Sequence, residues 1–140
     1  IEFAVNEHPF QIGIDEPHYL VFMDDPADNP RLLRALAGSS GMKVTFNLRF
    51  TDIDLRGIPD SVYRGSGVIA AWLALWMGCD PVYLCGMDLY QGKQKYCHGD
   101  EGYENLPIYV TPLEEHFKRW RTLPKDKRLH PLSGPLTQIF

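Results

Sequence analysis

The chain has 140 residues, of which 44% are hydrophobic and 23% charged, and such a composition is typical of one globular domain that can bury its own core. The formal net charge of −4 gives no basic face of the kind that nucleic acid requires, so we expect no nucleic-acid partner. The longest apolar run, residues 68–79, is too short to cross a bilayer, so no transmembrane segment is expected.

The first half of the chain alternates strand-like and helix-like segments. Apolar runs predict strands over residues 1–5 and 19–23, and an alternating, β-branched run predicts a third strand over 42–50. Between the second and third strands, Asn29 and Gly38 mark the two ends of a predicted helix. Because the first strand begins at the first residue, we expect a further segment upstream of it.

The second half continues this alternation after a turn-rich stretch. Ser66 opens an apolar helix that is expected to run to Met77, and a strand over 81–85 follows. Thr111 is expected to cap a further helix, with Pro112 at its first position and Glu114 completing a capping box, and a stripe of apolar residues is expected to face the core. A short strand near residue 129 completes the pattern.

Strands that alternate with helices predict an α/β fold, here a Rossmann-like, three-layer domain over residues 1–140 with a mainly parallel sheet. The apolar helix is expected to be buried all round, including Trp72 and Trp76. Ligands of such sheets bind beyond the carboxyl ends of the strands. The polar residues at the predicted strand ends are Asn6, Asp24, Asp25, Asn47, Asp88 and Ser133.

The triplet Gly65-Ser66-Gly67 leaves two interpretations open. Free backbone N–H groups and the positive end of the helix dipole can bind an anion, and the glycines allow a ligand to approach closely. Alternatively, Ser66 is an ordinary N-cap that needs no ligand. Asp88 is similarly open, because it could bind a sugar hydroxyl or a metal, or make a structural hydrogen bond.

The three cysteines, Cys79, Cys85 and Cys97, are an odd number, which favours buried thiols in a reducing compartment over a disulfide framework. We therefore expect a cytoplasmic protein. A zinc site that adds His98 is the alternative, although the chain has no C-x-x-C pair.

Residues 66–96, SGVIAAWLALWMGCDPVYLCGMDLYQGKQKY, resemble the central motif of the bacterial lipooligosaccharide sialyltransferases, which use CMP-sialic acid and need no metal. In that family a Ser-Gly pair starts a buried helix, and the next strand ends in Gly-x-Asp-(Phe/Leu)-Tyr-Gln. A second tyrosine follows six residues after the first. The matching residues here are Ser66, Gly86, Asp88, Tyr90, Gln91 and Tyr96. Upstream, Asn6 resembles the family's nucleotide-binding asparagine, and Asp25 stands where the family has another asparagine.

This resemblance implies a bacterial or phage glycosyltransferase that transfers a sugar from a CMP-sialic-acid-type donor to a hydroxyl of an acceptor glycan or small molecule, without a cofactor. It implies a nucleotide-binding set of Asn6, Asp25, Gly65, Ser66, Gly67, Gly86, Asp88 and Gln91. Tyr90 and Tyr96 would donate hydrogen bonds to the departing phosphate, and residues of about 91–110 would form a loop or lid. A homo-oligomer is also compatible with the chain.

The chain departs from the family pattern at three places. The opening strand and the Gly-Asn-Gly-Pro-Ser phosphate loop are absent from these residues, and the lid is shorter. Ile108 and Tyr109 stand where the family has its catalytic histidine. His98 is then the nearest candidate base, because the pKa of histidine suits proton transfer near neutrality; a surface histidine without a role is the alternative.

Two other functions remain open. The archaeal 6-hydroxymethylpterin diphosphokinase-like proteins also resemble this chain, in the Ser/Gly-led helix and the strand that ends Gly-x-Asp-Leu. That resemblance implies magnesium-dependent pyrophosphoryl transfer, with Asp88 and either Asp24 or Asp25 near Mg²⁺. The third alternative is a non-catalytic nucleotide-binding or assembly domain that keeps the fold.

Overall fold

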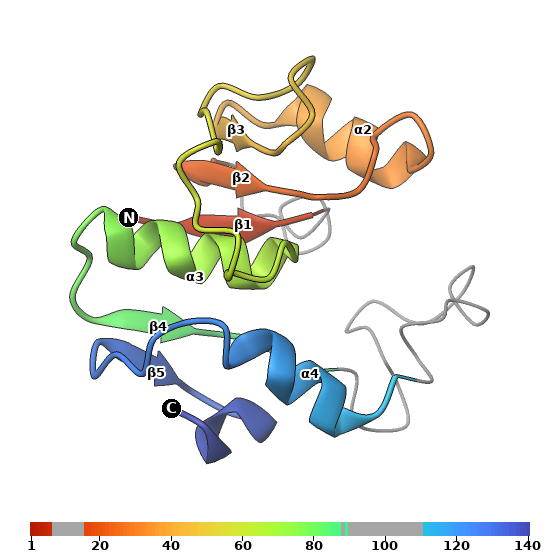
Figure 1. The fold of residues 1–140 in the computed structure, drawn as a ribbon. Coiled ribbons are helices and arrows are strands. Elements are labelled where there is room, and N and C mark those ends of the chain that lie inside the picture. Colours follow the sequence, from red (N-terminus) through yellow and green to blue (C-terminus); the bar gives the residue numbers. More distant parts are fainter. Residues whose placement is uncertain (7–15, 88, 90–110) are drawn as a thin grey trace. The chain divides into compact units, whose positions relative to one another are not determined.

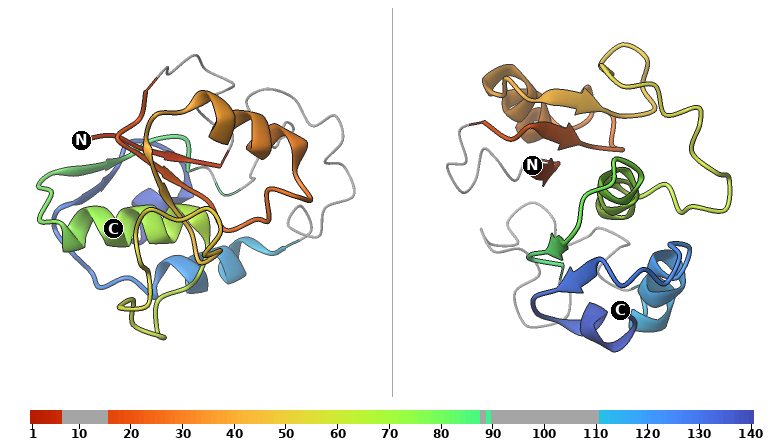
Figure 2. Two further views of the ribbon diagram at one scale, coloured as in Figure 1. Left: turned by 90° about the horizontal axis from the view of Figure 1, so that it is seen from above. Right: turned by 90° about the vertical axis from the view of Figure 1, so that its left-hand side faces the viewer.

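The structure, a computed structural model, describes residues 1–6, 16–87, 89 and 111–140. These residues form three α-helices and five short strands, and every strand pair is parallel (Figures 1 and 2). The strands make two small sheets, so the predicted α/β class is confirmed. The chain consists of two compact units, Ile1–Cys79 and Asp80–Phe140. The single domain over residues 1–140 stays a prediction.

The first unit contains a three-stranded parallel sheet in the order β1-β2-β3. Its strands are β1 (Phe3–Val5), β2 (Tyr19–Val21) and β3 (Met42–Val44), and the last residues of the three strands stand in register. The carboxyl ends of all three strands therefore lie at one edge of the sheet. The strands predicted over 1–5 and 19–23 are confirmed in shorter form.

The third strand is much shorter than its sequence pattern predicts. β3 ends at Val44, and residues up to Phe50 form turns instead. The Asn47 side chain accepts a hydrogen bond from Arg49 N (3.1 Å), and Phe50 N donates to the Asn47 carbonyl (3.0 Å). An asparagine that bonds its own local backbone competes with the strand ladder, which is why the alternating pattern does not continue as a strand.

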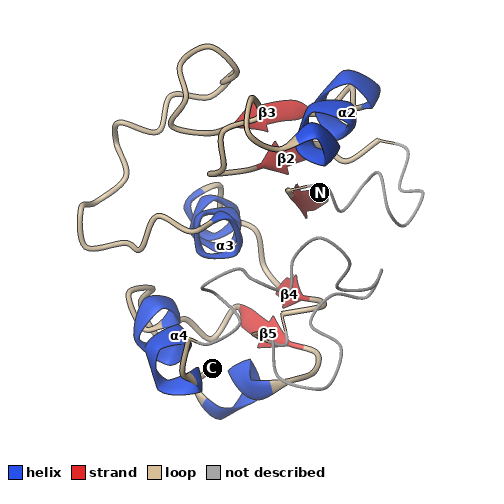
Figure 3. Cartoon of the chain, turned by 90° about the vertical axis from the view of Figure 1, so that its right-hand side faces the viewer, coloured by secondary structure: helices blue, strands red, loops and turns tan. Residues whose placement is uncertain are grey.

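Helix α2 (Pro30–Gly38) begins where its capping residue predicts. The Asn29 side chain accepts hydrogen bonds from Arg31 N (3.1 Å) and Leu32 N (3.0 Å), so two of the unpaired N–H groups at the helix start are satisfied. Leu32 is fully buried in a cluster with Leu20 of β2. Helices α2 and α3 lie on opposite sides of the sheet (Figure 3).

Helix α3 (Ser66–Trp76) packs against β1 and β2. Its buried residues are Val68, Ile69, Ala70, Ala71, Leu73, Ala74 and Leu75. The prediction that both tryptophans are also buried is wrong, because Trp72 is only half-buried and Trp76 is 71% exposed. An evenly apolar helix carries no periodic signal that would tell which residues face the sheet, and the aliphatic residues of α3 fill the buried side.

The second unit contains a two-stranded parallel sheet of β4 (Val82–Leu84) and β5 (Leu129–Pro131). Helix α4 (Leu113–Trp120) and a short 3₁₀ helix, η2 (Pro135–Gln138), complete it. The residues buried in this unit include Phe117, Trp120, Leu123, Leu129 and Leu136. The predicted strands over 81–85 and near residue 129 and the apolar stripe of α4 are thus confirmed.

Helix α4 begins differently from the prediction. Pro112 is the N-cap residue and no side chain makes a capping hydrogen bond there, so the predicted Thr111 cap is wrong. Glu114 does not close a capping box; its carboxylate accepts from Arg121 Nη1 at 2.6 Å. Two acidic residues in the first turn still suit the positive end of the helix dipole.

The structure also bears on two expectations, one about membrane-spanning segments and one about the cysteines. Among the residues described, no helix is long and apolar enough to cross a membrane. Cys79 is partly exposed and Cys85 is exposed, both as free thiols, so the expectation that these two thiols are buried is wrong. Cys97 lies outside the described residues.

Candidate functional site

The candidate site lies in the first unit, where β1 and β2 end. Asn6 directly follows β1 and has a left-handed backbone conformation, with φ of 54°. Asparagine is one of the few residues other than glycine that adopt this conformation at little cost. The Asn6 N–H donates to the Val21 carbonyl (2.9 Å), so the turn after β1 is tied to the last residue of β2.

Ser66, the first residue of α3, links this helix to the ends of β1 and β2. Its hydroxyl donates to Asn6 Oδ1 (2.9 Å) and accepts from Met23 N (3.1 Å). Asn6, Met23 and Ser66 therefore form one hydrogen-bonded group, which we call the strand-end cluster. All three residues are half-buried. Residues that are 60 and 43 positions apart in the sequence thus meet where a parallel sheet and a helix start converge.

The cap interpretation of Ser66 is wrong. Gly65 is the N-cap residue of α3, and no side chain makes a capping hydrogen bond there. A hydroxyl has one proton to donate and two lone pairs, and the proton of Ser66 goes to Asn6. The role of Ser66 within the described residues is consequently to connect β1, β2 and α3.

The two predicted glycines stand on either side of Ser66. A Cβ atom added to Gly65 would lie 2.6 Å from Cε1 of the Tyr63 ring, so a side chain here would displace that ring. Gly67 lies in the first turn of α3 and is half-buried, like Gly65. The Tyr63 ring therefore lies against the backbone at Gly65.

Arg64, which is not among the predicted site residues, adds a positive charge next to this helix start. Its guanidinium carbon lies 4.6 Å from the centroid of the Phe46 ring, and Nη2 lies 3.2 Å from Asp60 Oδ1. The signal available in the sequence was an arginine directly before a Gly-Ser-Gly helix start. The Met23 N–H, by contrast, could not be predicted, because backbone groups carry no sequence identity.

Asp25 also follows β2, but its carboxylate has a local partner. Oδ1 of Asp25 accepts from Ala27 N (2.9 Å), and the Asp25 carbonyl accepts from Asp28 N (3.0 Å). This is the geometry of an Asx turn, a common structural use of aspartate. The exposed Asp25 side chain therefore shapes the turn after β2 and is not hydrogen-bonded to the strand-end cluster.

The remaining predicted site residues belong to the second unit. Gly86 follows β4, is exposed and has a positive φ of 67°, a conformation that favours glycine. The residues that lie outside the described part of the chain are Asp88, Tyr90, Gln91, Tyr96 and His98. Their roles stay predictions. No group of three or more metal-ligating side chains occurs within the described residues.

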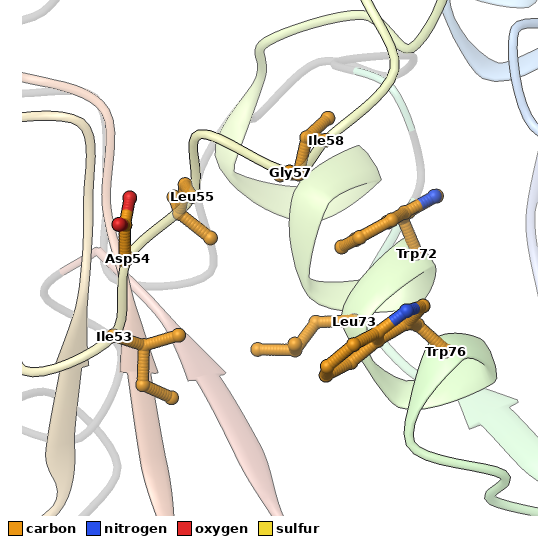
Figure 4. A pocket seen from close by; sticks show the side chains of 8 residues that line it. All are labelled: Ile53, Asp54, Leu55, Gly57, Ile58, Trp72, Leu73 and Trp76. Atoms are coloured by element: carbon orange, nitrogen blue, oxygen red, sulfur yellow. The ribbon is translucent and has the colours of Figure 1, made fainter.

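A hollow of about 110 Å³ opens at the other end of α3 (Figure 4). Its lining consists of Ile53, Asp54, Leu55, Gly57, Ile58, Trp72, Leu73 and Trp76. The two indole rings are stacked, with centroids 6.0 Å apart and planes inclined by 13°. Hydrogen bonds from the Arg56 guanidinium lower the pKa of the Asp54 carboxyl to about 2. The hollow and the strand-end cluster are thus separate features of the first unit.

Comparison with known proteins identified no relative of this chain. No protein-family model, no curated protein and no solved structure matches the chain. Kinship with the sialyltransferases or with the diphosphokinase-like proteins therefore stays a prediction from the motif in residues 66–96.

Proposed function

We propose that the chain is a sialyltransferase-like glycosyltransferase domain of Rossmann-like type that binds a nucleotide sugar of the CMP-sialic acid kind. The observation that carries the proposal is the hydrogen bond from Ser66 Oγ to Asn6 Oδ1. These are the two residues that the motif resemblance assigns to the nucleotide, and they are 60 positions apart in the sequence. A chance pair of polar residues has no reason to meet at the carboxyl edge of a parallel sheet.

Three features of this edge support nucleotide binding. Parallel α/β sheets bind ligands beyond the carboxyl ends of their strands, which is where Asn6 and Met23 lie. The N-terminus of α3 presents backbone N–H groups and the positive end of the helix dipole, both of which favour a phosphate. Gly65 and Gly67 add no side chains of their own on either side of Ser66, although the Tyr63 ring lies against Gly65.

The transfer reaction that we propose is a single inverting displacement. An acceptor hydroxyl attacks the anomeric carbon, its proton passes to His98, and the bond from that carbon to the phosphate oxygen breaks. The electron pair of the broken bond stays on CMP, whose phosphate accepts hydrogen bonds from Tyr90 and Tyr96. Two neutral phenol donors take the place that a divalent cation has in other nucleotide-sugar enzymes.

The motif resemblance also gives roles to other residues. It implies that Gly86, Asp88 and Gln91 bind the nucleotide, and Asp25, which it adds to this set, shapes the turn after β2. The acceptor is a glycan or a small molecule with a free hydroxyl, and the setting that we propose is cytoplasmic. The segment 91–110 acts as the lid.

Thermal unfolding in the presence of nucleotides tests the proposal. A ligand that binds the native state raises the melting temperature, by an amount that grows with its concentration relative to Kd. We expect stabilisation by millimolar CMP without Mg²⁺ and no additional effect of Mg²⁺. Stabilisation only by ATP with Mg²⁺ would instead favour the pyrophosphokinase alternative. If neither nucleotide changes the melting temperature, both enzymatic functions are refuted and the non-catalytic domain is favoured.

A further inference from the structure

The one proton of the Ser66 hydroxyl is used inside the protein. It accepts a hydrogen bond from Met23 N at 3.1 Å and donates its one proton to Asn6 Oδ1 at 2.9 Å. While these bonds persist, Ser66 has no proton left for a phosphate or a base. A direct donor role of Ser66 towards a nucleotide would require the bond to Asn6 to break first.

Asn6, in contrast, is held by two hydrogen bonds, and neither of them uses the N–H donors of its side chain. Its backbone N–H is bonded to the Val21 carbonyl (2.9 Å), and its side-chain oxygen is bonded to Ser66. A carboxamide carries oxygen and NH₂ on the same carbon, so fixing the oxygen also fixes the direction of both N–H bonds. Within the described part of the chain the NH₂ group has no hydrogen-bond partner, and Asn6 is only half-buried.

We propose that Ser66 is a positioning residue and that the NH₂ group of Asn6 is the group that contacts the ligand. The inference rests on the proposed function and refines it. The part of the ligand that faces Asn6 must carry hydrogen-bond acceptors. In CMP these acceptors belong either to the nucleoside (the O2/N3 edge of cytosine and the ribose oxygens) or to the phosphate, and these two sources can be separated by experiment.

A double-mutant cycle on the whole chain tests the positioning role. Asn6→Gly removes the amide and still tolerates the left-handed backbone, whereas Ser66→Ala removes only the hydroxyl. The probe is CMP, with Kd measured by titration calorimetry. We expect each single variant to weaken binding about three- to tenfold, which corresponds to the loss of one hydrogen bond. The double variant should bind as Asn6→Gly does, because Ser66 acts only through Asn6.

Ser61→Ala is the matched control, since Ser61 is an exposed serine of the same unit, and its CMP affinity should equal that of the wild type. Cytidine as a second probe locates the acceptor. A loss that is equal for cytidine and CMP assigns Asn6 to the nucleoside, and a loss confined to CMP assigns it to the phosphate. If the losses of the two single variants add in the double variant, Ser66 contacts the ligand itself and the proposal is overturned.

A measurement without nucleotide separates this inference from the proposed function. The side-chain NH₂ resonances of Asn6 are identified in the NMR spectrum by their absence in Asn6→Gly. We expect Ser66→Ala to shift or broaden them and Ser61→Ala to leave them unchanged. Unchanged Asn6 resonances in Ser66→Ala would overturn the positioning role. If the wild type binds neither cytidine nor CMP, the proposed function fails and the recognition half of the inference fails with it, while the resonance shift still decides the positioning half.

Discussion

Two residues on α3 test which side of that helix is buried. Leu73 is 2% exposed and Trp76 is 71% exposed, although both are large and apolar. Truncating a buried leucine to alanine costs about 2–5 kcal/mol in the free energy of unfolding. For Trp76 less than a third of the surface is covered, about 70 Å², so the transfer cost is at most about 2 kcal/mol. The higher helix propensity of alanine offsets about 0.5 kcal/mol of this loss in the free energy of unfolding of Trp76→Ala.

Urea unfolding of Leu73→Ala and Trp76→Ala, followed by far-UV circular dichroism, gives the two free energies. Circular dichroism is preferred to fluorescence because the second variant removes a fluorophore. We expect Leu73→Ala to lose more stability than Trp76→Ala, about 2–5 kcal/mol against at most about 1.5 kcal/mol. An equal loss in the two variants would refute the exposed position of Trp76 and would support the all-round burial that the sequence pattern predicts.

Three further predictions concern single side chains. Asn29→Ala should cost about 1 kcal/mol, because it removes the capping hydrogen bonds of α2; a loss within error of zero in urea unfolding would contradict this. Asn6→Ala should be less stable than Asn6→Gly by about 1–2 kcal/mol, because alanine disfavours the left-handed backbone, and equal stability would show that this conformation is absent. Hydrogen bonds from Arg128 lower the pKa of Asp126 to about 2, so its NMR titration should have a midpoint near pH 2, and Arg128→Gln should raise that midpoint. Because the folded pKa lies below the ordinary value of 3.8, this pair favours the folded state above about pH 4 and loses that effect as the pH falls through 2; a midpoint that Arg128→Gln leaves unchanged would contradict the assignment.

Much of the local structure was predictable because its causes are local. Asn29 caps α2 through bonds to residues two and three positions ahead, and such spacings are visible in a sequence. The α/β class followed in the same way, from the order of strand-like and helix-like segments. The early end of β3 is a local effect too, but the Asn47 turn was hidden by the β-branched and aromatic residues around it.

The strand-end cluster was predictable only in part. Asn6 and Ser66 were chosen from a motif resemblance, and the bond between them connects positions that no local pattern relates. The same hydroxyl suggested a helix cap, since serine is common at that position. Its actual partners are Asn6 and a backbone N–H of Met23, and they depend on how the sheet and α3 pack. Tertiary packing therefore decided between two chemically reasonable roles.

The most direct test of the proposed site is a titration of the ¹⁵N-labelled chain with CMP, without Mg²⁺, followed by NMR. We predict that the largest shifts fall on the backbone amides of Met23 and Ser66 and on the side-chain amide of Asn6, and that they saturate with one Kd. Shifts confined to the Trp76 end of α3, or no shifts at millimolar CMP, would contradict a nucleotide site at the strand-end cluster.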